Sequence, residues 1–272
     1  MSARAQPGRS RATSLFEATP GVRLEYVVTG SGPPTTVFAH GLAGSIAETR
    51  PLGSGVHGSR VFFHFRGHGR SAPSLSAWSY TALAAELRGI ADHVGATRAV
   101  GVSLGAGALS NLIIDAPRRF HKLVFFLPAV LDQQRPDAAV ARIAEMAALV
   151  DARDVQGLAG ILVADQPAGV RNRGDVRVWA EGRARTLAGT TVSSALREMS
   201  AEVAIADVRP LAAVVAPALV IAQQGDEAHP VRVAERLAGA LGNAKLHVFD
   251  ADGALWTHRR KLRALVAGFL ND

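Results

Sequence analysis

The chain has 272 residues, and 48% of them are hydrophobic, which is enough to fill the core of one large or two small domains. This composition excludes a wholly disordered chain, and 27 glycines and 13 prolines without a short repeat exclude a fibrous one. Because the sequence has no cysteine, it excludes disulfides, thiolate metal sites and cysteine nucleophiles. No charge-free run of about 18 apolar residues occurs, so we expect no membrane span.

The charge balance is basic, with 30 Lys and Arg against 23 Asp and Glu and a net charge of +7. These basic residues are scattered and aromatic residues make up only 6% of the chain, whereas a nucleic-acid interface gathers basic residues in one motif or face. We therefore expect no nucleic-acid partner. Residues 1–14 are predicted to be a flexible basic tail without the apolar stretch of a secretory signal, so we expect a cytoplasmic protein.

The amino-terminal half alternates short apolar runs with turn residues and helical stretches. A helix is expected where Leu83, Leu87 and Ile90 recur at helical spacing. In chain order, the expected elements are strands at 23–28, 35–39 and 60–65, a helix at 80–93, a strand at 98–102, a helix at 104–114 and a strand at 122–127.

The pattern changes at residues 129–208, where strands are lacking and helices are expected at 138–150 and 193–203. Alternation then returns with a strand at 218–222, a helix at 231–241, a strand at 245–249 and a last helix. Short apolar strands that alternate with helices predict an α/β fold, a mostly parallel sheet with helices on both faces. We interpret 15–128 and 209–272 as its core and 129–208 as an inserted helical cap.

A G-x-S-x-G motif at residues 101–105 places Ser103 between an apolar strand and a helix. A sharp turn there pushes the serine hydroxyl out above the sheet and leaves no room for side chains at Gly101 and Gly105. The helix that follows aims free N–H groups at any oxyanion bound beside the serine. This context favours a nucleophilic Ser103 over a merely tight turn.

Two further segments, FAHGL at 38–42 and RGHGRS at 66–71, complete a resemblance to the α/β-hydrolase superfamily from about Leu15 onward. The likeness is to its cap-bearing, cofactor-free serine esterase and haloperoxidase-like members. It implies the α/β-hydrolase fold, no cofactor, and an oxyanion hole made by the backbone N–H groups of Leu42 and Leu104. In this family an Asp usually precedes the RGHGRS-type loop by two residues, where this chain has His64.

The acid of the expected triad follows the strand after the cap. In the resembling family this turn carries a Gly, an acid and a Pro about four residues beyond the acid, and Asp226 and Pro230 keep that spacing. The carboxylate would accept a hydrogen bond from an imidazole and fix its tautomer. Glu227 is the rival carboxylate, and an Asp that only caps the next helix is the alternative.

The base is where the sequence departs from the family, which usually has Gly-His shortly after the last strand, whereas this chain has Ala254. In the family's chain order, the histidines left after Asp226 are His229, His247 and His258. We assign His229 to the turn of the acid and His247 to a strand interior. His258, on the apolar face at the start of the last helix, is therefore predicted to be the general base.

The alternatives to His258 are a core histidine at that position, with His40 or His68 as the next candidate bases. Both of these lie in glycine-bounded loops, where an imidazole bonds nearby backbone, and neither has the ligand spacing of a metal site. We predict no metal.

The leading interpretation is a serine hydrolase that acts on an ester or related acyl bond of a small molecule. A dehalogenase or epoxide hydrolase on the same fold needs an aspartate nucleophile, and Ser103 argues against it. The third hypothesis is a catalytically degenerate member that serves as a binding or regulatory protein, since Ala254 stands where the histidine is expected.

Overall fold

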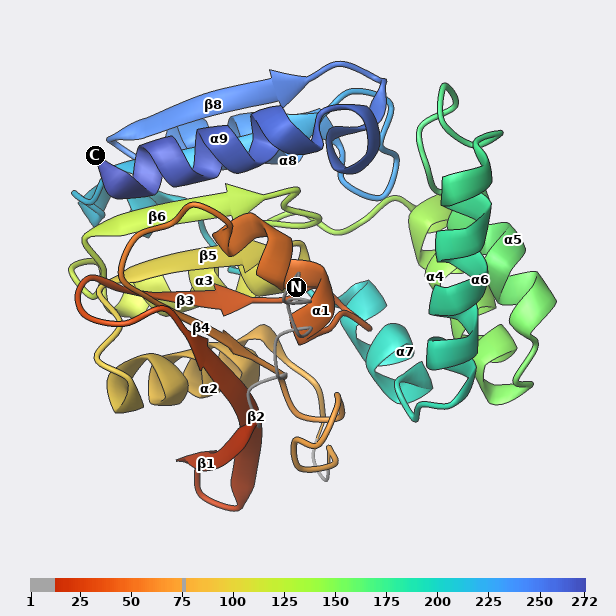
Figure 1. Ribbon diagram of the computed structural model, residues 1–272, viewed down its shortest axis with the longest axis horizontal. Coiled ribbons are helices and arrows are strands. Elements are labelled where there is room, and N and C mark those ends of the chain that lie inside the picture. Colours follow the sequence, from red (N-terminus) through yellow and green to blue (C-terminus); the bar gives the residue numbers. More distant parts are fainter. Residues whose placement is uncertain (1–12, 75–76) are drawn as a thin grey trace, which may run out of the picture.

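A central sheet of eight strands in the order β1-β2-β4-β3-β5-β6-β7-β8 organises the protein (Figure 1). The structure is a computed structural model that describes residues 13–74 and 77–272; residues 1–12 of the predicted tail lie outside them. The strands are β1 Ser14–Thr19, β2 Val22–Thr29, β3 Thr35–Ala39, β4 Ser59–Phe63, β5 Arg98–Val102, β6 Lys122–Phe126, β7 Ala218–Gln223 and β8 Ala244–Phe249.

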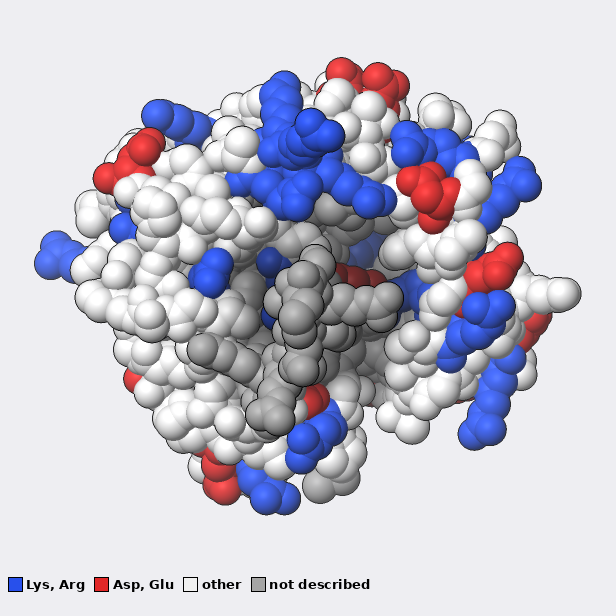
Figure 2. Space-filling model, in the orientation of Figure 1, with Lys and Arg blue, Asp and Glu red and all other residues white. Residues whose placement is uncertain are grey.

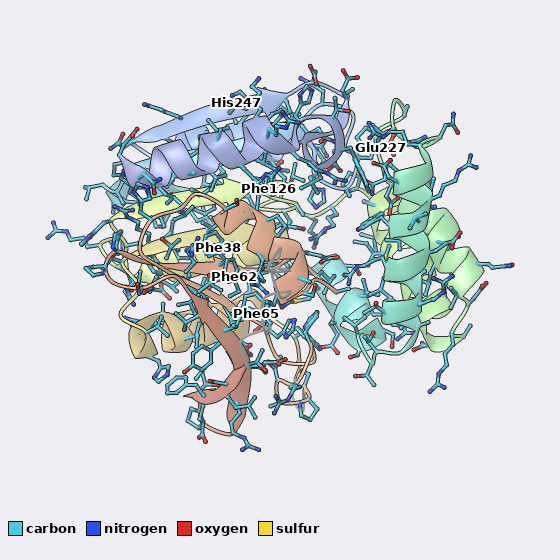
Figure 3. The ribbon with its side chains drawn as sticks, viewed as in Figure 1. Phe38, Phe62, Phe65, Phe126, Glu227 and His247 are labelled. Atoms are coloured by element: carbon cyan, nitrogen blue, oxygen red, sulfur yellow. The ribbon has the colours of Figure 1, made fainter. Side chains whose placement is uncertain are left out.

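The sheet is mostly parallel, as the sequence predicts. Strand β2 pairs antiparallel with β1 and β4, and every other pairing is parallel. Successive side chains alternate between two buried layers, so that Val37 packs into one and Phe38 into the other. Phe38 from β3, Phe62 from β4 and Phe126 from β6 belong to the same layer (Figure 3). Burial on both faces explains why these strands read as continuous apolar runs.

Helices cover both faces of the sheet. Leu83, Leu109 and Leu237 pack in the layer of Val37, while Leu262 and Val266 pack in the layer of Phe38. These residues belong to α2 Tyr80–His93, α3 Leu104–Asp115, α8 Val231–Ala240 and α9 Arg259–Asn271. A short helix, α1 Ile46–Thr49, follows β3. Short turns of tighter or wider helix lie at Arg50–Gly53, Arg209–Ala213 and Gly253–Thr257. None of the described helices is long and apolar enough to cross a bilayer.

Four helices between β6 and β7 form a separate layer beyond the carboxyl ends of the strands, at the right of Figure 1. They are α4 Asp137–Asp151, α5 Val155–Ala164, α6 Gly174–Ala188 and α7 Ser193–Ala201. The sequence predicts α4 and α7 but not α5 and α6. Helix α6 buries small residues such as Ala180 and Ala184, which leave only a weak apolar period. We call α4–α7 the cap.

The strand–helix junction at Gly101 yields a test of the packing. An alanine Cβ there would lie 2.5 Å from the Gly105 carbonyl oxygen and 2.7 Å from the Ala106 Cα, and backbone atoms cannot swing aside. We expect Gly101→Ala to lower the free energy of unfolding by about 1–3 kcal/mol, measured by urea titration.

The matched control is Gly160→Ala in α5, where an added Cβ meets nothing within 4 Å. This exposed helical position should gain about 0.5–1 kcal/mol, because alanine loses less backbone entropy on folding. Equal stability of the Gly101→Ala variant and the wild type would contradict the close approach at the junction.

Candidate active site

Ser103 occupies a strained turn between β5 and α3. Its φ of 50° and ψ of −107° fall outside the regions that residues with a side chain prefer, a conformation that costs on the order of 1–3 kcal/mol. The turn is held by a 3.0 Å hydrogen bond from the Ser103 N–H to the carbonyl oxygen of Phe126 in the next strand. Gly105 allows α3 to approach β3, because a Cβ there would lie 2.5 Å from the Ala39 carbonyl oxygen. The predicted need for glycine on both sides is confirmed.

His229 lies against the Ser103 hydroxyl. Its Nε2 is 3.0 Å from the Ser103 Oγ, and its Nδ1 is 3.0 Å from both carboxylate oxygens of Asp226. Because the carboxylate only accepts, Nδ1 carries the proton in the neutral ring and Nε2 accepts from the serine hydroxyl. The three side chains form a continuous hydrogen-bonded chain.

The structure contradicts the prediction that His258 lies at Ser103. The Nε2 of His258 is 2.8 Å from the Asp250 Oδ1, and its ring stacks on Phe249. The helical turn Gly253–Thr257 comes between β8 and α9, so His258 only begins α9 and pairs with the strand end behind it. His229 does lie in the turn of Asp226, as the sequence predicts, and it reaches Ser103 from that turn.

The turn between β7 and α8 brings the acid and the imidazole together. Gly225 adopts a φ of +71°, and the Asp226 Oδ1 also accepts the His229 backbone N–H at 3.0 Å. Burial alone would raise the pKa of Asp226, but attraction to His229 and hydrogen bonds from the turn hold it below its usual value. Asp226 thus bonds within its own turn and does not cap α8, which begins after Pro230 without a side-chain cap.

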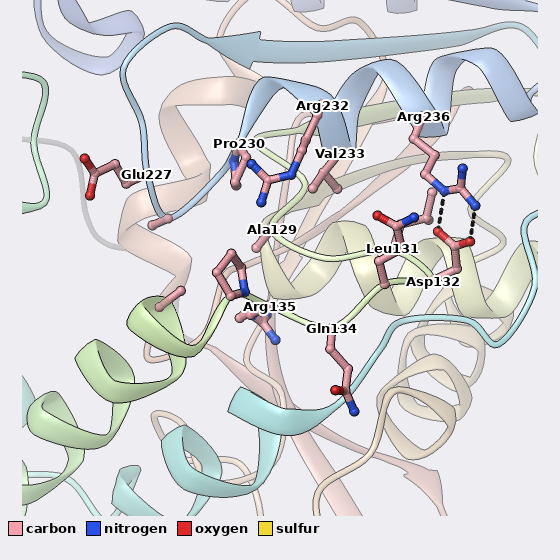
Figure 4. A pocket seen from close by; sticks show the side chains of 14 residues that line it. Ala129, Leu131, Asp132, Gln134, Arg135, Glu227, Pro230, Arg232, Val233 and Arg236 are labelled. Carbon is pink, nitrogen blue, oxygen red and sulfur yellow. Dashed lines mark hydrogen bonds and ion pairs between the residues drawn. The ribbon is translucent and has the colours of Figure 1, made fainter.

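Glu227, the rival carboxylate, lies outside this chain of hydrogen bonds. Its side chain is exposed and points away from the start of α8 (Figure 4). The position after β8 where the sequence lacks a histidine is held by Ala254, which is fully buried. Its backbone N–H donates to the Gln223 side-chain oxygen at 2.5 Å. The loop after β8 therefore contributes packing but no imidazole beside Ser103.

Two backbone segments flank the serine hydroxyl. A Cβ built on Gly41 would lie 3.3 Å from the Ser103 Cβ and 3.9 Å from its Oγ, so the loop that continues through Leu42 passes directly beside the serine. Leu104 is the first residue of α3, and N–H groups in the first turn of a helix have no acceptor within it. The geometry is compatible with the oxyanion hole expected from Leu42 and Leu104.

His40 braces this loop from behind. Its Nδ1 donates to the Gly41 carbonyl oxygen at 2.7 Å, and its Nε2 accepts the Phe65 backbone N–H at 3.0 Å. The ring is fully buried, and burial holds its pKa well below the usual range. Both nitrogens are thus used by backbone groups, and His40 is not hydrogen-bonded to Ser103.

His64 takes over structural bonds at the position where the family usually has an Asp. Its Nε2 accepts the Ile46 N–H at 3.0 Å, and its Nδ1 donates to the buried Glu25 carboxylate at 2.9 Å. Glu25 also accepts from Thr13 at 2.6 Å and from the Arg70 N–H at 2.7 Å. Burial alone would raise the pKa of Glu25, and these hydrogen bonds hold it below its usual value.

The remaining residues of the RGHGRS loop are anchored to neighbouring elements. The Arg66 guanidinium pairs with Glu86, which is fully buried in α2, and the Arg66 N–H donates to the same carboxylate at 3.0 Å. The Ser71 hydroxyl donates to the His64 carbonyl oxygen at 2.7 Å and accepts the Glu25 N–H at 2.9 Å. These bonds anchor the loop to α2 and to β2.

A cleft separates the sheet core from the cap (Figure 2). One hollow of about 300 Å³ adjoins the turn of His229 and is walled by the segment after β6 and the start of α8 (Figure 4). At its far end Arg236 holds Asp132 through bonds of 2.6 and 2.5 Å. The hollow thus opens beside the turn that carries His229.

One cluster offers ligand atoms for a metal ion. Asp250, Asp252 and His258 each place one such atom within 4.8 Å of the others, and both carboxylates are exposed. None of these residues contacts Ser103, His229 or Asp226 in the described hydrogen bonds. The cluster therefore carries no part of the serine chemistry.

Burial of His40 and His68 predicts a loss of stability in acid. Burial is the main cause that lowers both pKa values, for His68 to about 4. Below about pH 6.5 these two histidines bind protons in the unfolded chain but not in the folded chain. Their contribution to the free energy of unfolding is therefore fully present above about pH 6.5 and is lost as the pH falls toward 4. We expect the free energy of unfolding to fall by about 1 kcal/mol per pH unit for each histidine between about pH 6 and 5.

Urea titrations across this range check the expectation. His68→Asn should remove its share of the slope, whereas His57→Asn, a change at an exposed histidine, should leave the slope as it is. If the free energy of unfolding of His68→Asn falls with pH as steeply as that of the wild type, burial of His68 is not a cause of the loss of stability in acid.

Comparisons with known proteins agree with this architecture. The family model for the alpha/beta hydrolase fold matches residues 34–255. A bromoperoxidase from Bacillus anthracis superposes with a TM-score of 0.78 at 19% identity, over 96% of this chain and 100% of that one. An esterase from Exiguobacterium antarcticum gives 0.77 at 17% identity, over 96% and 100% of the two chains. At these identities the likeness concerns the fold.

Among curated proteins, the chain is similar to the dihydrolipoyllysine-residue acetyltransferase component of the acetoin cleaving system of Cupriavidus necator. The two are 29% identical over 119 residues, which are 42% of this chain and 31% of the relative. The match thus spans less than a third of that protein's length. Because the family model covers most of the chain and the sheet is mostly parallel with helices on both faces, the protein belongs to the alpha/beta hydrolase fold family.

Proposed function

We propose that the protein is a serine hydrolase that cleaves an ester or related acyl bond of a small molecule. The observation that carries the proposal is the hydrogen-bonded chain from the Ser103 Oγ through His229 to Asp226, with 3.0 Å at each link. These distances suit proton transfer to and from the imidazole. The esterase and the hydrolases among the similar structures support a hydrolase of the same class.

In the first half of the proposed reaction, the Ser103 Oγ attacks the substrate carbonyl carbon while its proton passes to the His229 Nε2. The N–H groups of Leu42 and Leu104 would donate to the oxyanion of the tetrahedral intermediate. Asp226 holds the Nδ1 proton and stabilises the imidazolium. His229 then protonates the leaving alcohol, and an acyl-enzyme on Ser103 remains.

In the second half, water enters beside His229, which removes a proton while the water oxygen attacks the acyl carbon. The same two N–H groups would stabilise the second oxyanion, and the Ser103 Oγ leaves with the proton returned from His229. The products are a carboxylic acid and the free enzyme. Ser103 and His229 are only half-buried, so water can reach the acyl group on Ser103 and the imidazole of His229.

The position of His229 bears on the non-enzymatic hypothesis. Ala254 motivates a degenerate binding or regulatory protein only if no imidazole reaches Ser103, and His229 is 3.0 Å from its hydroxyl. The remaining support for that hypothesis is the unusual place of the histidine in the chain.

The first test is Ser103→Ala. Removal of the nucleophile should lower kcat for p-nitrophenyl ester hydrolysis by on the order of 10⁶, as for other serine triads, with the fold intact. Labelling by a fluorophosphonate probe should disappear in the same variant. A variant that keeps more than about a tenth of the wild-type rate would contradict the role of Ser103, and a wild type that neither turns over esters nor takes the label would favour the binding protein.

The second test separates the two histidines. His229→Ala should lower kcat by on the order of 10⁶. The matched control His258→Ala removes an imidazole bonded to Asp250 and should retain nearly the full rate. The reverse outcome would restore His258 as the base and refute the assignment of His229.

The third test concerns the acid. Asp226→Asn should cost about 10⁴ in kcat, because an amide stabilises the wrong imidazole tautomer. Glu227→Gln is the control and should be nearly neutral, since Glu227 is exposed and outside the hydrogen-bonded chain. A large loss on Glu227→Gln alone would reassign the acid.

A further inference from the structure

Trp256 lies in the loop between β8 and α9, residues 250–258, and packs against the cap. Only 9% of the residue is exposed. Its indole N–H donates to the side-chain oxygen of Gln166, just after α5, at 2.8 Å. Its ring meets that of Trp179 in α6 edge to face, with 5.5 Å between the centroids. Trp256 thus attaches the core to two segments of the cap.

The contact is a small apolar cluster, separate from the two layers against the sheet. Its buried members besides Trp256 are Val170 and Val176, and Trp179 packs on them. These three belong to the segment 170–179 of the cap. The Arg259 guanidinium lies over the indole ring, 5.0 Å from its centroid. An aromatic pair and a cation over a ring each stabilise such a contact beyond the area that it buries.

On its other side, the loop after β8 is bonded to the chain at the end of β7. The Ala254 N–H donates at 2.5 Å to the side-chain oxygen of Gln223, which is 4% exposed. The Gln224 N–H donates to the Phe249 carbonyl oxygen at 2.9 Å. These bonds lie where the turn 224–230 begins, the turn that holds the acid and the imidazole and that we call the relay turn.

Close packing adds to these bonds. A Cβ built on Gly225 in the relay turn would lie 3.6 Å from the Ala251 Cβ, and one built on Gly169 in the cap would lie 3.7 Å from the Asp252 Oδ1. Both are ordinary contact distances. Neighbouring residues of the loop after β8 therefore lie beside the relay turn and beside the cap.

The charges of the cap and the relay turn also interact. Asp165, directly after α5, accepts from the Arg142 Nε at 3.0 Å. Burial raises the pKa of Asp165, Arg142 lowers it, and the Asp226 carboxylate raises it further. The segment of the cap that binds Trp256 is therefore near enough to the relay turn for their charges to act on one another.

We propose that Trp256 is a positioning residue that ties the relay turn to the cap, so that docking of the cap on the indole holds His229 against Ser103. The path runs from Gln166 through Trp256 and the loop after β8 to the end of β7. The proposal rests on the hydrolase function above for the reaction that His229 serves, but not for the coupling itself.

The first test replaces Trp256 and follows His229 by NMR in protein labelled with ¹⁵N at histidine. Trp256→Ala removes the indole from the cluster, and the Nδ1 resonance of His229 should shift or broaden in the folded variant. For p-nitrophenyl ester hydrolysis, kcat should fall by on the order of 10² with a smaller change in KM, since a misplacement of about 1 Å costs this much. An unmoved His229 resonance would overturn the proposal, whatever the rate.

Conservative variants isolate the hydrogen bond and keep the test open if Trp256→Ala does not fold. Trp256→Phe keeps an aromatic ring and removes the N–H, and Gln166→Leu removes its acceptor from the cap side. Each should shift the His229 resonance in the same direction. The double variant should shift it no further, because both changes break one bond. Additive shifts would refute a path through this bond.

A matched control loosens the cap at another place. Arg183 in α6 pairs with Glu48 in α1 at 3.0 Å, a contact between cap and core that does not involve the loop after β8. Glu48→Gln weakens this pair and should leave the His229 resonance where it is. A shift as large as that of Trp256→Phe would show that Trp256 is not the route.

The two proposals fail separately. A His229 resonance that responds to Trp256→Phe, in a protein without Ser103-dependent ester turnover, would reject the hydrolase and keep the coupling. Ester turnover that is lost on Ser103→Ala, together with a His229 resonance that no Trp256 variant moves, would keep the hydrolase and reject the coupling.

Discussion

The left-handed backbone of Ser103 is the constraint on which the site depends. A residue with a side chain holds this conformation only where its surroundings over-determine it. Here the hydrogen bond to Phe126 secures one side of the turn, and the close approach of α3 to β3 through Gly105 secures the other. The energy that offsets the strain comes from the two apolar layers against the sheet. The position of the Ser103 hydroxyl therefore depends on the packing of the whole core.

Near this turn, two histidines hold backbone segments together through both of their ring nitrogens. His40 joins the loop beside the serine to the backbone after β4, and His64 joins the start of α1 to Glu25. An imidazole bridges a donor and an acceptor about one ring width apart, which a carboxylate cannot do, because it only accepts. This difference explains how His64 can stand where the resemblance to the family implies an Asp, because Glu25 supplies the negative charge.

Much of this arrangement was open to prediction from local patterns. The elbow follows from a serine between two glycines at a strand–helix junction, and the parallel sheet from apolar runs that alternate with helices. The sequence did not predict strand β1, because Ser14–Thr19 is exposed or half-buried along its length and carries a charge. Whether His229 reaches Ser103 depends on how the turn between β7 and α8 folds back on itself. The hydrophobic periodicity of the sequence carries no information on the shape of that turn. The signal available was its place three residues after Asp226, at the carboxyl end of a buried strand.

The shared turn of Asp226 and His229 reduces the number of parts that must stay aligned. With acid and imidazole on different loops, a proton relay spans three independently attached segments, and a small shift of any one breaks it. Here two segments suffice: the elbow after β5 and the turn after β7. Strand β8 and helix α9, at the edge of the sheet, contribute packing to the core but stand outside the relay. Changes at that edge which keep its packing against the core therefore leave the proposed triad in place.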